Sequence, residues 1–473
     1  MSAQERNPLH APLSRRQALK LMGGLAGMAA LAGCAAPVAA PAATGGEAAA
    51  PAGEMPKLVV AHRREYFAEM ETLFADAVTK WGQENNVEIE TTTVDAEASQ
   101  NFVPKLLAQV QAGDPPNVVY HIRLTLQLYG QDAVEEVSDA VAEQEAMYGK
   151  APRGQIINNV IDGKWYGIPY MMHGGGHFAR RSVFDGKGID VTTLTTWEQV
   201  RDACLTVSDS AADMYGWGLT INSGGDATGL IEGVMQDWGG HYTNEEATEV
   251  TFNSPETMGA IEFLAEIYTS EQYAPMLPPG VMSWNDSSNN EAYLASTIAY
   301  TSNAASVYAK AKADGLTEIF DDTHVMETLV GPAGQKREAG GGGQFIIPRG
   351  ATHQDLSKQL AAHMITPPVF LPISLISAGL FLPAYANYYT MDEVVEAFDA
   401  DPNLAMMGKH AQGEWLGASW PAQPSPYFDA IAAQAVLTDL LAQIVAQGVS
   451  VADAVAQAHE RMVSIGQEMG MFS

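Results

Sequence analysis

The chain of 473 residues is poor in cysteine and in positive charge. It contains two cysteines, Cys34 and Cys204, and 25 lysines and arginines against 56 acidic residues, for a formal net charge of −31. Since Cys34 falls in the N-terminal segment, no intrachain disulfide is expected, and the body must be stabilised by its apolar core. The negative charge without a basic stripe argues against nucleic-acid partners and against adhesion of the folded body to anionic lipid.

The chain also lacks the short motifs of common catalytic centres. No G-x-S-x-G elbow or phosphate-binding P-loop occurs, and the glycine runs are not followed by Lys-Ser/Thr. The pair His173 and His177 could indicate a metal site, but no Cys or acidic residue lies at the sequence spacing that a further metal ligand would need. We therefore predict a protein that is not an enzyme and has no metal or cofactor, with His173 lining a hinge as the preferred interpretation.

Long apolar runs are absent beyond the N-terminus. A basic segment, residues 14–20, leads into an apolar run of 13 residues, Leu21–Gly33, which is too short to span a bilayer and is typical of an export signal. Its Arg-Arg pair resembles a twin-arginine signal, with Ala18 where Phe is usual. The Leu-Ala-Gly-Cys end resembles a bacterial lipobox, so we predict lipid on Cys34; an ordinary signal with a chance cysteine is the alternative.

The segments that follow predict an anchored two-lobed body. Residues 1–33 are expected to be the signal, and residues 34–56, rich in Ala, Pro and Gly, a flexible linker. The membrane is then contacted only through the lipid on Cys34, on the outer face. The remaining chain exceeds the size of a single core, which predicts two lobes. The next most apolar run, Val369–Leu382, contains Pro372 and Gly379 and is expected to be buried or cleft-facing.

Strand and helix patterns alternate at the start of this body. Strands are expected at 57–61, 87–94 and 117–120, and helices at 67–81 and 102–111. This alternation predicts an α/β fold with βαβ units and mainly parallel sheets flanked by helices. Ligands of such sheets bind at the carboxyl ends of strands, which makes Tyr120, His121 and Arg123 candidates for the cleft, with a solvated loop as the alternative for the last two.

Later segments continue the pattern. An Asp-Gly turn at residues 162–163 predicts a hairpin, and the glycine run at 174–176 is expected to be the first crossing between lobes. Helices are expected at 196–207, 228–238 and from Pro255 onward, the first capped by Thr195 or Thr196 and the last by Asn253 or Ser254. A strand at 344–348 and helices at 354–364, 427–447 and 450–469 complete the chain, which has no internal repeat.

Five motifs occur in the order seen in one known family. They are Gly113–Val119, with Asn117 in place of the usual Asp, then Asp162–Pro169, Thr196–Val200, Asn253–Leu264, and the glycine run before Phe345–Pro348. With these five motifs and the lipobox, the chain resembles the extracellular solute-binding proteins of ABC importers. The resemblance is to the family-1 type, which includes carbohydrate binders. The resemblance implies a periplasmic-binding-protein fold of two α/β lobes with the ligand cleft between them. Lobe 1 is expected at 57–173 with about 323–376, and lobe 2 at 174–322 with about 377–473.

Sugar binding calls for aromatic rings to stack on and polar side chains for the hydroxyls. By family position, the loop Trp284-Asn285-Asp286 and Asn303 face the cleft; a surface turn is the alternative for the loop. The remaining candidates each have a purely structural alternative: helix capping for Asp226, and core packing for Trp238, Trp415 and Trp420.

These observations predict a monomeric component of an ABC importer that captures a small solute by lobe closure and delivers it to the permease subunits. A carbohydrate is the favoured solute. A polyol, a polyamine or a glycerol-phosphate-like molecule is the alternative within this class. A secreted lipoprotein enzyme acting on polysaccharide is the alternative from another class, and a structural lipoprotein is disfavoured by the α/β pattern.

Overall fold

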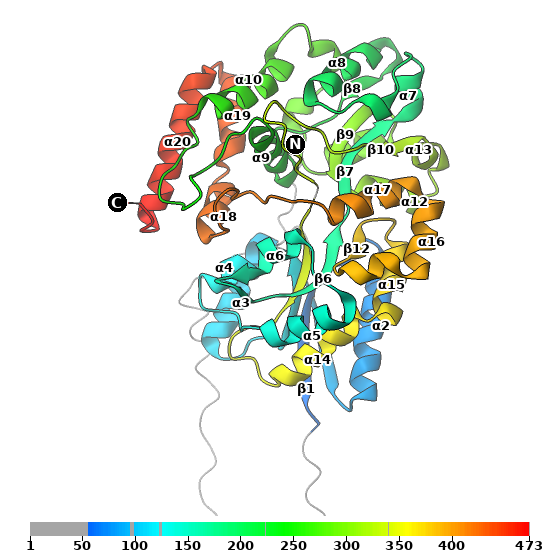
Figure 1. The fold of residues 1–473 in the computed structure, drawn as a ribbon, viewed down its shortest axis with the longest axis vertical. Coiled ribbons are helices and arrows are strands. Elements are labelled where there is room, and N and C mark those ends of the chain that lie inside the picture. Colours follow the sequence, from blue (N-terminus) through cyan, green and yellow to red (C-terminus); the bar gives the residue numbers. More distant parts are fainter. Residues whose placement is uncertain (1–54, 95–98, 123–124, 223, 339, 473) are drawn as a thin grey trace, which may run out of the picture. The chain divides into compact units, whose positions relative to one another are not determined.

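The computed structural model describes residues 55–472, apart from 95–98, 123–124, 223 and 339. Two separate sheets with helices packed around them make up this part of the chain (Figure 1). We call the six-stranded sheet with its helices the first lobe, and the four-stranded sheet with its helices the second lobe. The predicted signal, most of the linker and Cys34 lie outside the described residues.

The first sheet has the strand order β12-β6-β11-β3-β1-β2. Its strands are β1 (Lys57–Arg63), β2 (Glu88–Val94), β3 (Val118–Ile122), β6 (Ile168–His173), β11 (Gly342–Ile346) and β12 (Phe381–Pro383). β1 pairs in parallel with β2 and β3, as the βαβ pattern predicts, whereas β11 is antiparallel to β3 and β6, and β12 is antiparallel to β6.

The second sheet has the order β10-β7-β9-β8. Its strands are β7 (Gly175–Arg180), β8 (Tyr215–Trp217), β9 (Ile298–Ala304) and β10 (Thr323–Val325). β7 is antiparallel to both neighbours, and β8 is parallel to β9. The expected α/β fold is confirmed, but both sheets are mixed rather than mainly parallel. Successive strands of a sheet run parallel when a crossover helix joins them. A strand that enters the sheet from the other lobe has no such crossover and can therefore run antiparallel to its neighbours.

The helices of the first lobe bury one apolar face each. In α2 (Ala68–Glu84) this face consists of Met70, Phe74, Val78 and Trp81, whose helical spacing was already visible in the sequence. The others are α3 (Ser99–Ala112), α4 (Thr125–Tyr129), α5 (Ser138–Tyr148), α6 (Arg153–Asn159), α14 (Gln354–Ile365) and α15 (Pro367–Ile376). A small hairpin, β4 (Val160–Ile161) and β5 (Lys164–Trp165), turns at Asp162 and Gly163, which both have positive φ as a type I′ turn requires.

Two helices of the second lobe begin at the predicted caps. α8 (Trp197–Val207) starts with a capping box between Thr196 and Gln199, and α10 (Pro255–Thr269) is capped by Ser254. The other helices after β7 are α7 (Arg181–Asp185), α9 (Gly225–Asp237), α11 (Ser288–Leu294), α12 (Ser306–Ala313) and α13 (Thr317–Asp322). Helices late in the chain are α16 (Asp392–Ala400), α17 (Pro402–Ala411), α18 (Pro426–Ala433), α19 (Val436–Gln447) and α20 (Val451–Glu468).

Backbone hydrogen bonds join the segments that pass between the two sheets. The chain leaves β6 at His173 and enters β7 at Gly175. The amide of His173 donates to the carbonyl of Gly341 at 3.0 Å, and that of Gly174 donates to the carbonyl of Gly379 at 3.1 Å. Segments that are far apart in sequence therefore lie side by side at this crossing.

Two of the expected lobe boundaries differ from the structure. β10 at 323–325 pairs with β7 in the second sheet, so the chain has not yet returned to the first lobe at residue 323. β12 at 381–383 pairs with β6 in the first sheet, so the chain has not left the first lobe at residue 377. Both strands are three residues long, too short to be recognised from period-two alternation.

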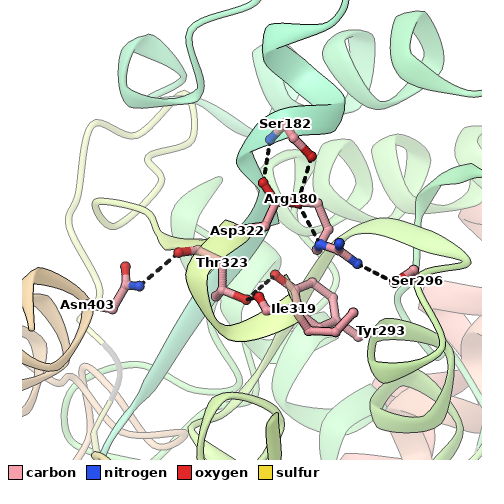
Figure 2. Close-up of polar contacts among 8 residues, drawn as sticks. All are labelled: Arg180, Ser182, Tyr293, Ser296, Ile319, Asp322, Thr323 and Asn403. Carbon is pink, nitrogen blue, oxygen red and sulfur yellow. Dashed lines mark hydrogen bonds and ion pairs between the residues drawn. The ribbon is translucent and has the colours of Figure 1, made fainter. Parts of the chain in front are cut away.

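An ion pair between the buried Arg180 and the partly buried Asp322 ties β7 to α13 in the second lobe (Figure 2). Asp322 accepts from Arg180 Nε at 2.9 Å, and it also accepts from the amide and hydroxyl of Ser182 at 2.6 and 2.8 Å. Arg180 donates in addition to Ser296 Oγ at 2.8 Å. Each of the two charges thus has several partners, which compensates for the loss of water around it.

One stretch of the described chain, Pro426–Gln447, is long and apolar enough by composition to cross a membrane, although no such run was expected beyond the N-terminal segment and the sequence predicted only a helix at 427–447. A second arises only if the bent pair α14 and α15 is counted as one span. In Pro426–Gln447 the residues Tyr427, Ile431, Leu437 and Leu441 are buried in the core of the second lobe. The apolar composition is thus accounted for by packing against α9, α10 and α20.

A candidate binding cavity between the two sheets

A cavity of about 520 Å³ lies where segments of both lobes meet. The first lobe contributes Arg63 at the end of β1, Ile122 at the end of β3, and Phe381 in β12. The second lobe contributes one face of α9 and the end of β9. Its volume falls within the range of roughly 300–1,000 Å³ that is usual for small-molecule sites.

Four of the residues singled out in the sequence line this cavity: His173, Asp226, Asn303 and Trp415. The Trp415 ring is close-packed against Gly340, where any added Cβ would collide with it, and its carbonyl accepts from Arg153 Nε at 3.2 Å. Trp415 is 8% exposed. The ring is therefore held in one position, with a small part of its surface exposed at the cavity wall.

Tyr120 and His121 do not line the cavity. β3 continues to Ile122, so both side chains still project from the strand into covered faces of the first sheet. Tyr120 stacks on Phe74 in the core, and the His121 ring stacks on Phe102 at 5.1 Å between centroids. The prediction placed the carboxyl end of this strand two residues too early. Arg123 lies outside the described residues.

The loop Trp284-Asn285-Asp286 supports α9 instead of lining the cavity. Asp286 accepts from the amides of Gly225 and Asp226 at 2.9 and 3.1 Å, so it caps the start of α9. Asn285 accepts from the amide and hydroxyl of Ser287, and the Trp284 carbonyl accepts from Thr220 Oγ1. The capping role expected for Asp226 thus belongs to Asp286, which frees the Asp226 carboxyl for the cavity.

Two further tryptophans are also outside the cavity lining in the described part of the chain. Trp238 stacks on Phe263 with centroids 4.8 Å apart, and Trp420 meets His241 at 4.6 Å. Both rings therefore serve packing, the structural alternative that the sequence left open.

The structure adds lining residues that the sequence analysis missed. They are aromatic or charged, and include Arg63, Tyr66, Trp197, Asp237, Arg337, Glu338 and His410. Arg63 could have been predicted in the same way as the residues after β3, since it ends the parallel strand β1 and ligands bind at the carboxyl ends of such strands. Arg337 and Glu338 lie three and two residues before the second glycine run, which begins at Gly340. Asp237 had no local signal, because its importance comes from contacts made by distant segments.

Two carboxyls of the cavity wall are held in a poorly solvated environment. Burial raises the pKa of Asp226 to about 6, with the charge of Asp286 adding to the effect and a hydrogen bond from Asn289 opposing it. Burial likewise raises the pKa of Asp237 to about 6, opposed by the hydrogen bond from Trp197 and by the charge of Arg337. Trp197 Nε1 donates to Asp237 Oδ2 at 2.7 Å. Near neutral pH both carboxyls are mainly ionised acceptors.

Two histidines of the cavity wall, His177 and His410, contact other groups of the protein. Burial, with the charges of His410 and Arg337, lowers the pKa of His177 to about 3, so this ring is neutral, and its Nδ1 lies 2.7 Å from the Tyr300 hydroxyl. His410 Nδ1 lies 3.3 Å from the carbonyl of Gly175, and its Nε2 lies 3.9 Å from Glu338. No group of three or more His, Cys, Asp or Glu side chains placed to hold a metal ion occurs among the described residues.

Comparison with known proteins identifies the family. The family model described as bacterial extracellular solute-binding protein matches residues 76–406, which is more than half of the chain. The chain belongs to this family. The resemblance inferred from the five motifs is therefore confirmed.

The sequence identity to a known relative is low. An arabinooligosaccharide-binding protein of Halalkalibacterium halodurans is 22% identical over 313 residues, which cover 62% of this chain and 64% of that relative. The chain thus aligns with less than two thirds of that protein's length.

Solved structures share the fold. The sugar-binding protein MalE of Xanthomonas citri matches with a TM-score of 0.71 at 16% identity, over 87% of this chain and 98% of the other. A maltose-bound protein of T. maritima matches at 0.70 and 14%, over 86% and 99%. A ribitol complex from Agrobacterium radiobacter K84 matches at 0.69 and 13%, over 86% and 98%. The two-lobed binding-protein fold predicted from sequence is confirmed by these likenesses.

Proposed function

We propose that this protein is the solute-capturing component of an ABC importer and that its solute is a carbohydrate. The observation that carries the proposal is the cavity, to which both lobes contribute and whose wall combines aromatic rings with acceptors and donors. Trp415 and Tyr66 offer ring surfaces, while Asp226, Asp237 and Asn303 offer groups for hydroxyls. A ligand in contact with both lobes favours their closed arrangement, which the permease subunits then engage.

The mixed charge of the wall supports a neutral solute. Arg63 and Arg337 would repel a polyamine, and Asp226, Asp237 and Glu338 would repel a phosphate-bearing solute. The ligands named for relatives, an arabino-oligosaccharide and maltose, are neutral sugars. A polyol, which ribitol exemplifies in a structural neighbour, is the nearest alternative.

Hydrolysis of polysaccharide finds less support in this cavity. Glycosidases place two carboxyl groups roughly 5–9.5 Å apart. Asp226 and Asp237 are the cavity carboxyls with a raised pKa, and they lie at opposite ends of α9, eleven residues apart, or about 16 Å along the helix axis. That pair is too widely spaced for the two-carboxylate mechanism.

The test is calorimetric titration of residues 57–473 with sugars, polyols and polyamines. We expect saturable binding of a sugar at one site without any product. Trp415→Ala should weaken that binding about tenfold, since a ring stack is worth about 1 kcal/mol beyond its buried area. Trp420→Phe is the control and should leave the affinity unchanged. Binding of polyamine alone would overturn the carbohydrate assignment, and consumption of sugar would favour an enzyme.

We further propose that the protein is a monomer held at the outer face of the membrane by lipid on Cys34. The lipobox and the preceding signal support this anchor. A Cys34→Ser variant is expected to lose the incorporation of labelled fatty acid that the wild-type protein shows, because the thiol that would carry the lipid is gone. Equal incorporation in the variant and the wild type would contradict lipid attachment at Cys34.

A further inference from the structure

One face of α9 runs along the cavity. Asp226, Gly229, Leu230, Gly233 and Asp237 all line it, and their i, i+3, i+4, i+7, i+11 pattern places them on a single face of the helix. The first and last of these residues are eleven positions apart, about 16 Å along the axis. A single sugar ring does not reach from one end of this face to the other.

The two glycines on this face have different environments. A Cβ added at Gly233 would lie 2.6 Å from Nη1 of Arg337, so this glycine lets the guanidinium pack against the helix. A Cβ added at Gly229 would have no described atom within 4 Å. A glycine inside a helix costs about 0.5–1 kcal/mol relative to alanine. Contacts within the protein thus explain the glycine at position 233 but not the one at position 229. Gly229 leaves an unfilled stretch of helix surface on the cavity side, which we call the open floor.

Polar groups stand at both ends of this open floor. Asp226 lies at the first, where its Oδ2 accepts from Asn289 Nδ2 at 3.0 Å. Asp237 lies at the second, beside Arg337, and is 4% exposed. Its Oδ1 has no hydrogen-bond partner among the described residues, although Oδ2 is paired with Trp197. A buried carboxylate oxygen without a partner is costly, and a hydroxyl arriving in the cavity would provide one.

From this arrangement we infer that the solute lies lengthwise along α9, over Gly229, with Asp226 at one end and the side chains of Asp237 and Arg337 at the other. The site then takes an oligosaccharide in preference to a monosaccharide, and Gly229 is a specificity-determining residue. The inference rests on the proposed function, since it concerns the same cavity. It adds the length and the direction of the solute.

The experiment compares two sugar series, glucose to maltotetraose and arabinose to arabinotetraose, by calorimetry. In at least one series the wild-type protein should bind the trisaccharide at least tenfold more tightly than the monosaccharide. Gly229→Leu fills the floor and should weaken trisaccharide binding at least tenfold while changing monosaccharide binding less. Gly229→Ala should give an intermediate loss. Ala452→Leu, which adds bulk at an exposed position of α20, should bind like the wild type.

Thermal melts accompany each variant, and Gly229→Ala should melt no lower than the wild type because alanine favours the helix. If Gly229→Leu fails to fold, the alanine variant decides the test. Equal affinity of the wild type for monosaccharide and trisaccharide, or a folded Gly229 variant that binds the trisaccharide like the wild type, would overturn the inference but leave carbohydrate binding intact. An equal loss for both sugars would also overturn it. Binding of no sugar in either series would overturn this inference, and the proposed function itself would be refuted only if the broader sugar panel described above were also silent.

Discussion

Replacing Asp322 by asparagine is expected to lower the free energy of unfolding by about 3–5 kcal/mol, because it leaves a buried guanidinium without its counter-charge. Arg180 is 7% exposed, and Asp322 supplies acceptors to Arg180 and to Ser182 (Figure 2). Asparagine keeps the shape but removes the charge and replaces one acceptor oxygen by a donor. Urea denaturation followed by circular dichroism measures the change.

Two control variants separate this effect from an ordinary lost hydrogen bond. Ser296→Ala removes one acceptor of Arg180 and should cost about 1 kcal/mol. Asp139→Asn breaks the pair with Lys358, in which the Asp139 side chain is 66% exposed, and should cost less than about 1 kcal/mol. If Asp322→Asn cost no more than these controls, the pair would not be a major contributor to the stability of the second lobe.

Replacing Glu65 by glutamine is expected to stabilise the protein in alkaline solution. Burial raises the pKa of Glu65 from 4.5 to about 8, the charge of Glu71 adds to this, and Arg63 opposes it. Both carboxyl oxygens lack a hydrogen-bond partner among the described residues, and the side chain lies inside the first lobe with 6% exposure. Ionisation of this group in the folded state is therefore unfavourable.

The sign of the pH dependence follows from the protons bound in each state. Between pH 4.5 and about 8 the folded protein holds a proton on Glu65 that the unfolded chain has lost, so stability falls as the pH rises through this range. Each pKa unit is worth about 1.4 kcal/mol, so the shift from 4.5 to about 8 makes the full effect about 5 kcal/mol.

Glu65→Gln should remove this contribution. Its stability gain should be near zero at pH 4 and approach a few kcal/mol at pH 9, measured by urea denaturation across that range. Glu69→Gln, at an exposed position of α2, is the matched control and should keep the wild-type pH profile. A pH profile of Glu65→Gln that parallels the wild type would show that Glu65 ionises freely in the folded protein.

Much of the secondary structure was predictable because it depends on neighbours in the chain. The apolar spacing in α2, the Pro255 that follows the Ser254 cap, and the Asp162-Gly163 turn are patterns within one or two turns of backbone. The family motifs extended these local patterns to the two-lobed fold. Strand direction was less accessible, because the antiparallel partners β6, β11 and β12 come from segments far apart in the sequence.

The cavity residues were predictable only in part. Trp415, Asp226, His173 and Asn303 were found because loops, glycine runs and strand ends tend to carry binding groups. Tyr120 was misplaced by a strand two residues longer than expected. The loop residue Asp286 took the capping role expected of Asp226, because a helix N-terminus accepts a carboxylate from any segment that reaches it.

The sequence by itself determined the class of fold, most helices, their caps and the family, since these follow from periodicity and from local hydrogen bonding. Only the tertiary structure decided which polar side chains meet. Asp237 lines the cavity because Trp197 and Arg337, from distant segments, pack around the end of α9. Such contacts depend on how elements dock, and docking is set by the burial of whole faces rather than by any one stretch of residues.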